Sequence, residues 1–237
     1  MSAAHADAEV PVVAVDGPAA SGKGTIAAGA ASALGFHLLD SGSLYRLVAL
    51  KALENGIDVS AEAPLAGVAR RLDVSFSAGS ISLEGRDVGE AIREERVSAA
   101  ASRVAVHPAV RAALLARQRA FRRPPGLVAD GRDMGTVVFP DARLKVFVTA
   151  SAEERARRRY KQLIEKGISC TIEGLLLDIR ERDARDASRP VAPLVPAPDA
   201  VVLDTTGMSI EEAVGFVVRR YREIERSTGG GASKDSG

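Results

Sequence analysis

The sequence predicts an α/β fold in which helices cover both faces of a central parallel sheet. Short apolar runs, the first of them at residues 10–16 (VPVVAVD), alternate with segments of helical pattern along much of the chain. Such alternation favours parallel strands, because each connection crosses over the sheet through a helix. A ribbon of alternating apolar and polar residues at 72–88 departs from this order. We therefore expect an antiparallel insert there, projecting from the edge of the sheet.

The order of elements follows from the hydrophobic pattern. We expect strands at residues 10–16, 36–40, 127–130, 144–149 and 200–203. Helical pattern occupies residues 24–34, 44–54 and about 89–121. The last of these segments should break at His107-Pro108, because proline disfavours helical geometry in the residue before it.

Two capping boxes predict the starts of further helices. Ser151 and Glu154 have the spacing in which a hydroxyl and a carboxylate satisfy each other's backbone N–H groups, and a very basic segment follows them. Ser209 and Glu212 repeat the pattern before a final helix that we expect to run through residue 226.

Composition excludes several classes of protein. The chain has 237 residues, of which 46% are hydrophobic and 27% charged, as in ordinary globular proteins. Its apolar runs fall short of the roughly 20 residues that a membrane span needs. The single cysteine, Cys170, can form neither an internal disulfide nor a zinc site. We expect a cytoplasmic protein, since no secretory leader pattern opens the chain.

The basic residues are unevenly distributed. The net charge is only +1, so bulk attraction to nucleic acid is not expected, and with 4% aromatics stacking platforms for single strands are scarce. Arginine supplies 26 of the 32 basic residues, and residues 100–132 hold seven arginines against one acid, Asp130. Coding bias would explain the total but not the clustering. Arginine is favoured where a planar fork grips phosphate or carboxylate.

A glycine-rich segment at residues 17–25 lies between the first strand and the first helix, which is the context of a phosphate-binding loop. Glycine lets backbone N–H groups converge on phosphate, and the helix start adds a positive dipole. The alternative is an accidental glycine-rich turn. The loop comprises Gly17, Pro18, Ala19, Ala20, Ser21, Gly22, Lys23, Gly24 and Thr25.

One position of this loop departs from the usual motif. Ser or Thr is expected directly after the lysine, where this chain has Gly24. Thr25 is then the candidate for a magnesium role, directly or through water. The loop predicts a nucleotide donor but no particular reaction. A GTPase switch is disfavoured, because the chain has no Asn-Lys-x-Asp motif for reading guanine.

Three further blocks lie downstream of the loop: LLDSGSLYR at 38–46, DGRDMGTVVFPDA at 130–142 and RDARDASR at 182–189. In this order and spacing they resemble the bacterial cytidylate kinases, over about residues 10–226. The resemblance implies a P-loop kinase fold of three layers and transfer of the γ-phosphoryl group of ATP to CMP or dCMP with Mg²⁺.

The resemblance also implies a division of the chain. Residues 10–57 and 101–226 would form the core, residues 58–100 an inserted monophosphate-binding domain of mixed α/β structure, and residues 153–189 a mobile lid. Residues 1–9 are expected to be disordered and residues 227–237 to form a flexible tail. We expect a monomer that binds small molecules, without nucleic-acid or membrane partners.

Site residues carried over by the resemblance fall into three groups. Those at the reacting phosphates are Lys23, Arg46, Arg132, Arg182 and Arg189. Arg158 joins the phosphate loop in binding ATP. Those expected around the acceptor nucleotide are Ser41, Arg46, Ser102, Arg111, Arg132, Asp133, Asp186 and Arg189.

The chemistry of these side chains suits those roles. A monophosphate kinase holds two polyanions close together, so several arginines should converge on them. Cytosine presents an amino donor beside two acceptors, which a carboxylate such as Asp133 and a guanidinium such as Arg111 would match. Uracil would set an oxygen against the carboxylate. The alternative for Arg46 and Arg132 is a surface charge, and for Arg111 and Ser102 a pair on a helix surface.

Several assignments stay open at the sequence level. Asp130 would either orient magnesium-bound water or brace the phosphate loop. The consecutive arginines at 157–159 cannot share one helix face, so some point to solvent while others are lid candidates. Rival functions are a kinase of the same architecture acting on UMP, AMP or shikimate, and a phosphate-loop regulator or nucleic-acid-binding ATPase.

Overall fold

The computed structural model describes residues 10–77 and 80–229. The expected disordered segment 1–9 lies outside the described residues, as do residues 230–237 of the expected tail. The tail was predicted to begin at residue 227, and this boundary is wrong. Helix α8 (Ile210–Gly229) continues three residues beyond residue 226, because nothing in the sequence before Gly229 interrupts its hydrogen bonding.

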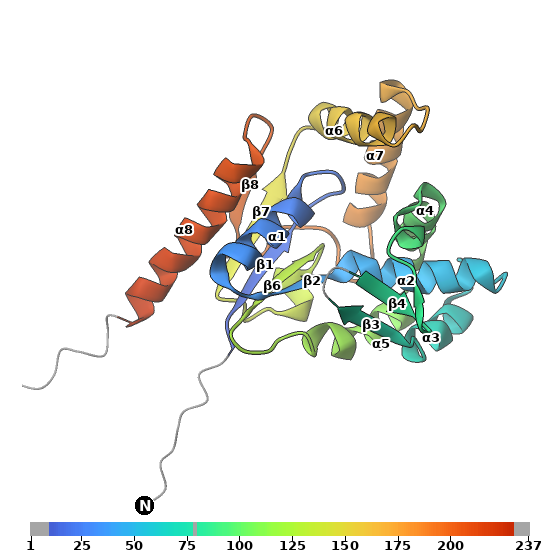
Figure 1. The fold of residues 1–237 in the computed structure, drawn as a ribbon, viewed down its shortest axis with the longest axis horizontal. Helices are drawn as coiled ribbons and strands as arrows, with labels where there is room; N and C mark the ends of the chain where they lie inside the picture. Colours follow the sequence, from blue (N-terminus) through green and yellow to red (C-terminus); the bar gives the residue numbers. More distant parts are fainter. Residues whose placement is uncertain (1–9, 78–79, 230–237) are drawn as a thin grey trace, which may run out of the picture.

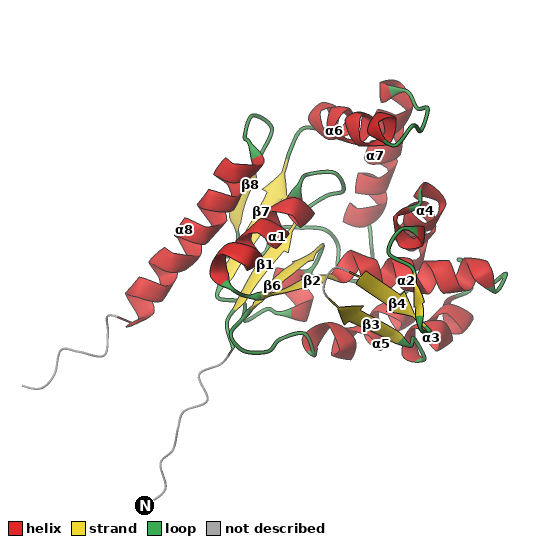
Figure 2. Cartoon of the chain, viewed as in Figure 1, coloured by secondary structure: helices red, strands yellow, loops and turns green. Residues whose placement is uncertain are grey.

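A five-stranded parallel sheet forms the centre of the fold, as expected (Figures 1 and 2). Its strand order is β2-β6-β1-β7-β8, and every neighbouring pair is parallel. The strands are β1 (Val12–Asp16), β2 (His37–Asp40), β6 (Leu127–Gly131), β7 (Leu144–Thr149) and β8 (Val201–Asp204). The carboxyl ends of β1, β2 and β6 therefore meet at one edge, which holds the phosphate loop and the blocks at 38–46 and 130–142.

Helices α1 (Lys23–Leu34) and α8 cover one face of the sheet. Val13 and Val15 of β1 point into this layer, and the intervening residues point to the other face, as the two-residue period of a strand requires. The two helices pack closely at Gly29, where a Cβ atom would lie 2.6 Å from the Val214 side chain. A larger residue at position 29 would push α8 off the sheet.

The other face belongs to a second core, which extends well beyond the sheet. Helices α2 (Ser41–Glu54), α3 (Glu62–Arg70), α4 (Glu95–Val104) and α5 (Pro108–Arg119) all contribute buried side chains to it. The small antiparallel sheet joins it through Leu83 and confirms the predicted ribbon. Its strands are β3 (Val74–Ser77), β4 (Ser80–Leu83) and β5 (Arg86–Asp87).

The expected insert at 58–100 is thus continuous with one layer of the core. Its predicted end at residue 100 falls inside α4, and α5 packs against α3 of the insert. The predicted helix at 89–121 is corrected at its start, because a 3₁₀ turn η1 (Ala91–Arg93) precedes α4. Its predicted break is confirmed, since α5 begins at Pro108.

Helices α6 (Ala152–Glu165) and α7 (Ile172–Ala187) pack against each other at the end of the sheet that holds the phosphate loop (Figure 1). They make up most of the segment 153–189, whose mobility stays a prediction. Ser151 caps α6, its Oγ accepting from the N–H of Glu154 at 3.1 Å. The second bond of the predicted box is replaced, because the N–H of Ser151 donates to Thr206. The box of Ser209 and Glu212 forms both bonds.

Three elements have no counterpart in the sequence prediction: α3, α7 and a π-helical turn η2 (Met134–Val138). None of the helices that the structure describes is both long and apolar enough to cross a bilayer.

Candidate active site

The phosphate loop runs from the end of β1 to the start of α1, as the sequence predicts. Gly17 has a φ of 153°, and a Cβ atom there would lie 2.0 Å from the carbonyl oxygen of Val148 on β7. Gly22 has a φ of 86°, in the left-handed region, immediately before α1. Both glycines are required by the backbone, one for space and one for conformation. The first turn of α1 carries no acidic residue, so its N–H groups remain suited to an anion.

Lys23 and Asp130 lie opposite each other at the ends of α1 and β6. Their Nζ and Oδ1 atoms are 3.6 Å apart. Burial lowers the pKa of Lys23 to about 8, and the positive charge of Arg132 acts in the same direction. Burial likewise raises the pKa of Asp130, against the opposing charge of Lys23. Each charge is therefore partly compensated by the other in a site that excludes water.

The departure at Gly24 has a structural reason in the same place. A Cβ atom at residue 24 would lie only 3.1 Å from Oδ2 of Asp130. Any side chain there would crowd the buried carboxylate. Thr25, the candidate for the magnesium role, lies in the first turn of α1 and is exposed.

Asp186 of α7 holds two of the predicted arginines together. It is 1% exposed, and its Oδ2 accepts from Nε of Arg132 at 2.8 Å while its Oδ1 pairs with Arg189. Burial alone would raise the pKa of Asp186, but the charges of Arg132 and Arg189 outweigh it and hold the pKa below its usual value. The carboxylate thus orients two guanidinium groups that come from distant segments of the chain.

Two further arginines border this cluster. Arg182 donates to Oγ of Ser98 at 3.4 Å, and its Nε has no partner among the residues that the structure describes. Burial, reinforced by Arg132, lowers the pKa of Arg182 to about 10. Arg46 of α2 is half-buried, and its charge lowers the pKa of both Asp130 and Arg182. The concentration of like charge in this region favours the binding of an anion.

A buried ion pair joins Arg111 of α5 to Asp133, which follows β6. The guanidinium also donates to the carbonyl of Ala105 at 3.2 Å, and its Cζ lies 5.7 Å from the centre of the Tyr45 ring. Burial alone would lower the pKa of Arg111, but the neighbouring Tyr45 and Asp133 outweigh it and raise the pKa above its usual value. Oγ of Ser102 is buried without a hydrogen-bond partner among residues 10–77 and 80–229. The structure therefore brings together a donor, the guanidinium of Arg111, and an acceptor, the carboxylate of Asp133, with the guanidinium lying against the ring of Tyr45.

The family model described as "Cytidylate kinase" matches residues 13–223. A cytidylate kinase of Bordetella bronchiseptica (strain ATCC BAA-588 / NCTC 13252 / RB50) is 60% identical over 90% of this chain and 95% of its own. This chain belongs to the cytidylate kinase family. A relative of the same name from Burkholderia vietnamiensis (strain G4 / LMG 22486) is 58% identical over 90% of this chain and 94% of its own.

A gluconokinase from Sinorhizobium meliloti 1021 is among the solved structures that match. It has a TM-score of 0.48 and 15% identity, and the match covers 93% of this chain and 97% of that chain.

Asp16 is a buried residue of this family member that the sequence reasoning did not assign to the site. Its two carboxylate oxygens accept from the backbone N–H groups of Met134 and Gly135, each at 2.8 Å. Burial raises the pKa of Asp16 to about 7, although these two bonds oppose the shift. Asp16 thereby anchors the turn that follows Asp133 to the strand that enters the phosphate loop. The only sequence signal was an acid at the end of an apolar strand.

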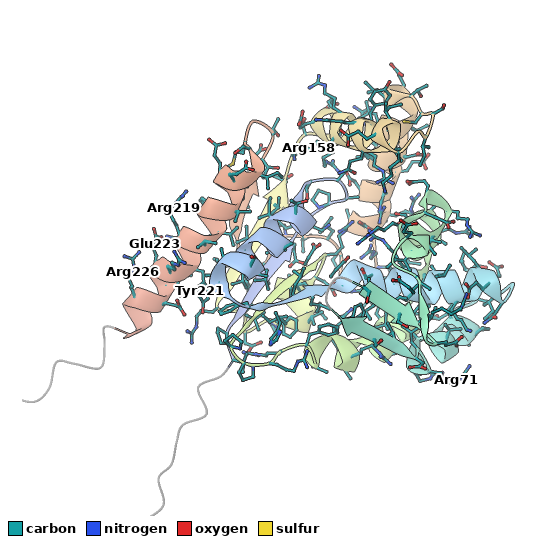
Figure 3. The ribbon with its side chains drawn as sticks, in the orientation of Figure 1. Arg71, Arg158, Arg219, Tyr221, Glu223 and Arg226 are labelled. Carbon is teal, nitrogen blue, oxygen red and sulfur yellow. The ribbon has the colours of Figure 1, made fainter. Side chains whose placement is uncertain are left out.

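Arg158 of α6 contacts the phosphate loop through a backbone carbonyl group. Figure 3 shows this side chain on α6. Its Nη1 donates to the carbonyl of Ser21 at 3.2 Å, and its Nη2 to the carbonyl of Thr205 at 2.6 Å. It thus supports the loop through the backbone of Ser21. Its predicted contact with ATP stays a prediction.

The remaining predicted residues also lie at the same edge of the sheet. Ser41 begins α2 directly after β2, and its Oγ lies against Gly131, where a Cβ atom would be 2.8 Å away. Pro18, Ala19 and Ala20 form the turn of the loop, in which Ala20 has a φ of 59°.

Mg²⁺ would find few protein ligands at this edge of the sheet. The described residues contain no cluster of three or more His, Cys, Asp or Glu side chains suited to a metal. Oδ1 of Asp130 is buried and accepts no hydrogen bond from the described residues; its neighbour is the ammonium of Lys23 at 3.6 Å, a distance that leaves the hydrogen-bonding capacity of this oxygen unused. Mg²⁺ commonly binds proteins through one or two carboxylates and takes its other ligands from phosphates and water. The site fits that sparse kind of magnesium binding.

Proposed function

We propose that this chain transfers the γ-phosphoryl group of ATP to CMP or dCMP, giving ADP and CDP or dCDP. One observation carries the proposal. Within four residues at the end of β6, Asp130 faces Lys23 of the phosphate loop, Arg132 pairs with Asp186, and Asp133 pairs with Arg111. The side chains suited to the donor phosphates, the acceptor phosphate and the base thus start from one short segment.

In the proposed mechanism the donor phosphates rest on the backbone N–H groups of residues 17–25 and on the ammonium of Lys23. Arg46, Arg132, Arg182 and Arg189 surround the acceptor phosphate and share the charge that spreads over the transferred group. Transfer is direct and in line, without a phosphorylated enzyme. An ionised phosphate is itself the nucleophile, so no general base is required.

Base selection rests on the pair of Arg111 and Asp133. We propose that Asp133 accepts from the amino group of cytosine and that Arg111 donates to its ring nitrogen and carbonyl, with the unpartnered hydroxyl of Ser102 assisting. Ser41, Asp186 and Arg189 are proposed to lie near the ribose and the acceptor phosphate. Uracil would place a carbonyl against Asp133 and leave two acceptors unpaired.

Asp130 and Thr25 are the residues proposed to hold Mg²⁺, in part through water. Bound there, the cation would supply positive charge that neutralises the charge developing on the phosphates. Lys23 contributes a second positive charge beside Asp130 and opposes the rise in the pKa of that carboxyl that burial causes.

Other parts of the proposal concern the molecule as a whole. Residues 153–189 are proposed to act as a lid that excludes water, which would otherwise accept the phosphate. The proposed partners are small nucleotides rather than nucleic acid, and the proposed state is a cytoplasmic monomer.

A coupled assay of ATP consumption tests the function. The acceptors are CMP, dCMP, UMP, AMP and none, at equal concentration. We expect rapid consumption with CMP and dCMP, much slower consumption with UMP and AMP, and a negligible rate without acceptor. Equal rates with all four nucleotides would contradict base selection. A rate independent of any acceptor would favour a phosphate-loop ATPase instead.

A further inference from the structure

Arg155 is a buried arginine on α6 to which neither the motifs nor the proposed mechanism gives a role. It is 5% exposed. Its guanidinium donates four hydrogen bonds: Nε to the carbonyl of Ala150 at 3.0 Å, Nη1 to the carbonyl of Ala19 at 3.3 Å, and Nη1 and Nη2 to the two oxygens of Asp183 at 3.0 and 2.6 Å. Such a planar, two-pronged pair fixes both the position and the orientation of its partners.

The partners of Arg155 belong to the two halves of the proposed site. Ala19 lies in the phosphate loop, and the carbonyl of Ala150 follows β7. Asp183 lies on α7, directly after Arg182 and less than one turn before Asp186. The guanidinium of Arg155 therefore connects the loop proposed for ATP to helix α7. The same helix carries Asp186, the carboxylate that pairs with Arg132 and Arg189.

The contact at Ala19 gives this connection a direction. In a phosphate-binding loop the N–H groups turn toward the anion, so the carbonyl groups turn toward the protein. Arg155 contacts one of these carbonyl groups. A change in the loop when phosphate binds would therefore move the guanidinium, and the two-pronged bond would pass the change to α7.

We propose that Arg155 is a positioning residue that couples the phosphate loop to α7, so that ATP in the loop sets the arginines around the acceptor phosphate. The inference rests on the proposed function, because it takes the two nucleotide sites from it. It requires the two nucleotides to affect each other's binding, since coupling between sites is reciprocal. Asp183 reaches the phosphate loop through Arg155, so changing Asp183 tests the connection without altering a residue of either proposed site.

The chain offers a matched control between the same two helices. Arg180 of α7 pairs with Glu153 of α6 at 3.1 Å, and these side chains are 61% and 54% exposed. Both pairs bridge α6 and α7, but the bond between Arg180 and Glu153 is exposed to solvent and involves no residue of the phosphate loop. If bridging the helices were sufficient, breaking either pair would have the same effect.

The test measures binding of CMP by calorimetry, with and without a non-hydrolysable ATP analogue and Mg²⁺. In the parent we expect the analogue to tighten CMP binding by at least about fivefold, the lower end of typical coupling between sites. Asp183→Asn keeps the shape but sets an amide N–H₂ against the guanidinium. We expect this variant to bind CMP alone as the parent does and to lose most of the tightening. Glu153→Gln should keep the full effect.

A second variant, Arg155→Lys, keeps the charge but cannot bond to both oxygens of Asp183 and to Ala19 at once. It should lose the coupling to the same extent as Asp183→Asn, and the double variant should lose no more than either single one. The titration repeated with the analogue against CMP-saturated protein should show the same factor. Thermal unfolding of each variant establishes that it is folded under the conditions used.

The coupling proposal is overturned if the analogue tightens CMP binding equally in the parent and in Asp183→Asn, or if the parent shows no tightening. It is also overturned if Glu153→Gln loses as much as Asp183→Asn. None of these results touches the proposed function, which fails separately if the parent binds neither CMP nor the ATP analogue, or does not turn them over.

Discussion

The ammonium of Lys23 and the carboxylate of Asp130 lie 3.6 Å apart at the point where the phosphate loop meets β6. Lys23 begins α1, while Asp130 lies near the end of a strand more than a hundred residues later. Asp130 is buried and Lys23 is half-buried, and this removal from water disfavours the charged form of each. The pair is therefore poised for a ligand that brings its own charge, as a nucleotide with a cation would.

Lys23→Ala should abolish most phosphoryl transfer while leaving the fold intact. The ammonium is proposed to act on charge that develops during transfer, so the loss should appear mainly in kcat. Removing one such group typically costs about 10²–10³-fold. Steady-state kinetics with ATP and CMP, beside the thermal unfolding midpoint, measure the effect. Near-normal kcat in a folded variant would contradict this role.

The same lysine should shape the pH profile. Because the pKa of Lys23 is lowered to about 8, the free enzyme loses this positive charge as the pH rises through that value. The quantity kcat/KM for ATP reports groups of the free enzyme, so it should decline above about pH 8. Lys23→Arg keeps its charge throughout and should remove this decline, whatever its activity at neutral pH. A decline that persists unchanged in Lys23→Arg would assign it to another group.

Arg132→Lys should be costly even though it preserves the charge. Nε of Arg132 donates to Asp186 and Nη1 donates to the carbonyl of Gly131 at 3.4 Å, which leaves the other N–H groups of the guanidinium to meet a phosphate. A lysine ammonium lacks the planar fork that meets a carboxylate and a phosphate at fixed positions, so we expect kcat/KM for CMP to fall by roughly tenfold or more. Arg46→Lys should behave similarly. If the kinetics of Arg46→Lys match those of the parent, Arg46 is an ordinary surface charge and does not bind the acceptor phosphate.

Asp133→Ala should weaken the preference for CMP over UMP. The proposed bond from the amino group of cytosine is lost with CMP, whereas the clash of two acceptors is relieved with UMP. Hydrogen-bonded sites can reject the wrong partner by as much as about 10⁴-fold, so the ratio of kcat/KM values is a sensitive measure. The change should come mostly from the CMP side. An unchanged ratio with lower overall activity would mean that Asp133 only supports the site through Arg111.

Asp16→Asn should loosen the turn that presents Arg132 and Asp133. An amide offers one acceptor oxygen where the carboxylate now receives two N–H groups at 2.8 Å. Displacement of a catalytic group by about 1 Å can cost up to about 100-fold, so we expect kcat/KM for CMP to fall at least tenfold. Asp199→Asn, which alters an exposed carboxylate paired with Lys145, is the control and should leave kcat/KM unchanged. Equal activity of Asp16→Asn and the parent would remove Asp16 from the site.

Much of the architecture followed from local patterns. The strand at 127–131 could be located because a parallel strand buried on both faces begins as a nearly continuous apolar run, and the strand at 144–149 is also mostly apolar although every second residue is only partly buried. The phosphate loop was evident because its glycines answer a local demand, the φ of 86° at Gly22 and the space needed at Gly17. Helix α3 was missed because its pattern is short, and the turn η2 because its N–H groups are bonded by Asp16, which is distant in sequence.

The sequence by itself determined the chemistry available: which segments form strands, where the glycines lie, and which blocks of arginine and aspartate follow them. Only the tertiary structure decided the pairings: Arg132 with Asp186, Arg111 with Asp133, Arg155 with Asp183 and the carbonyl of Ala19. The physical reason is that arginine and carboxylate interact with any partner of opposite charge. Composition and spacing cannot choose among them, whereas strand register and helix packing bring one particular pair within hydrogen-bonding distance and bury it.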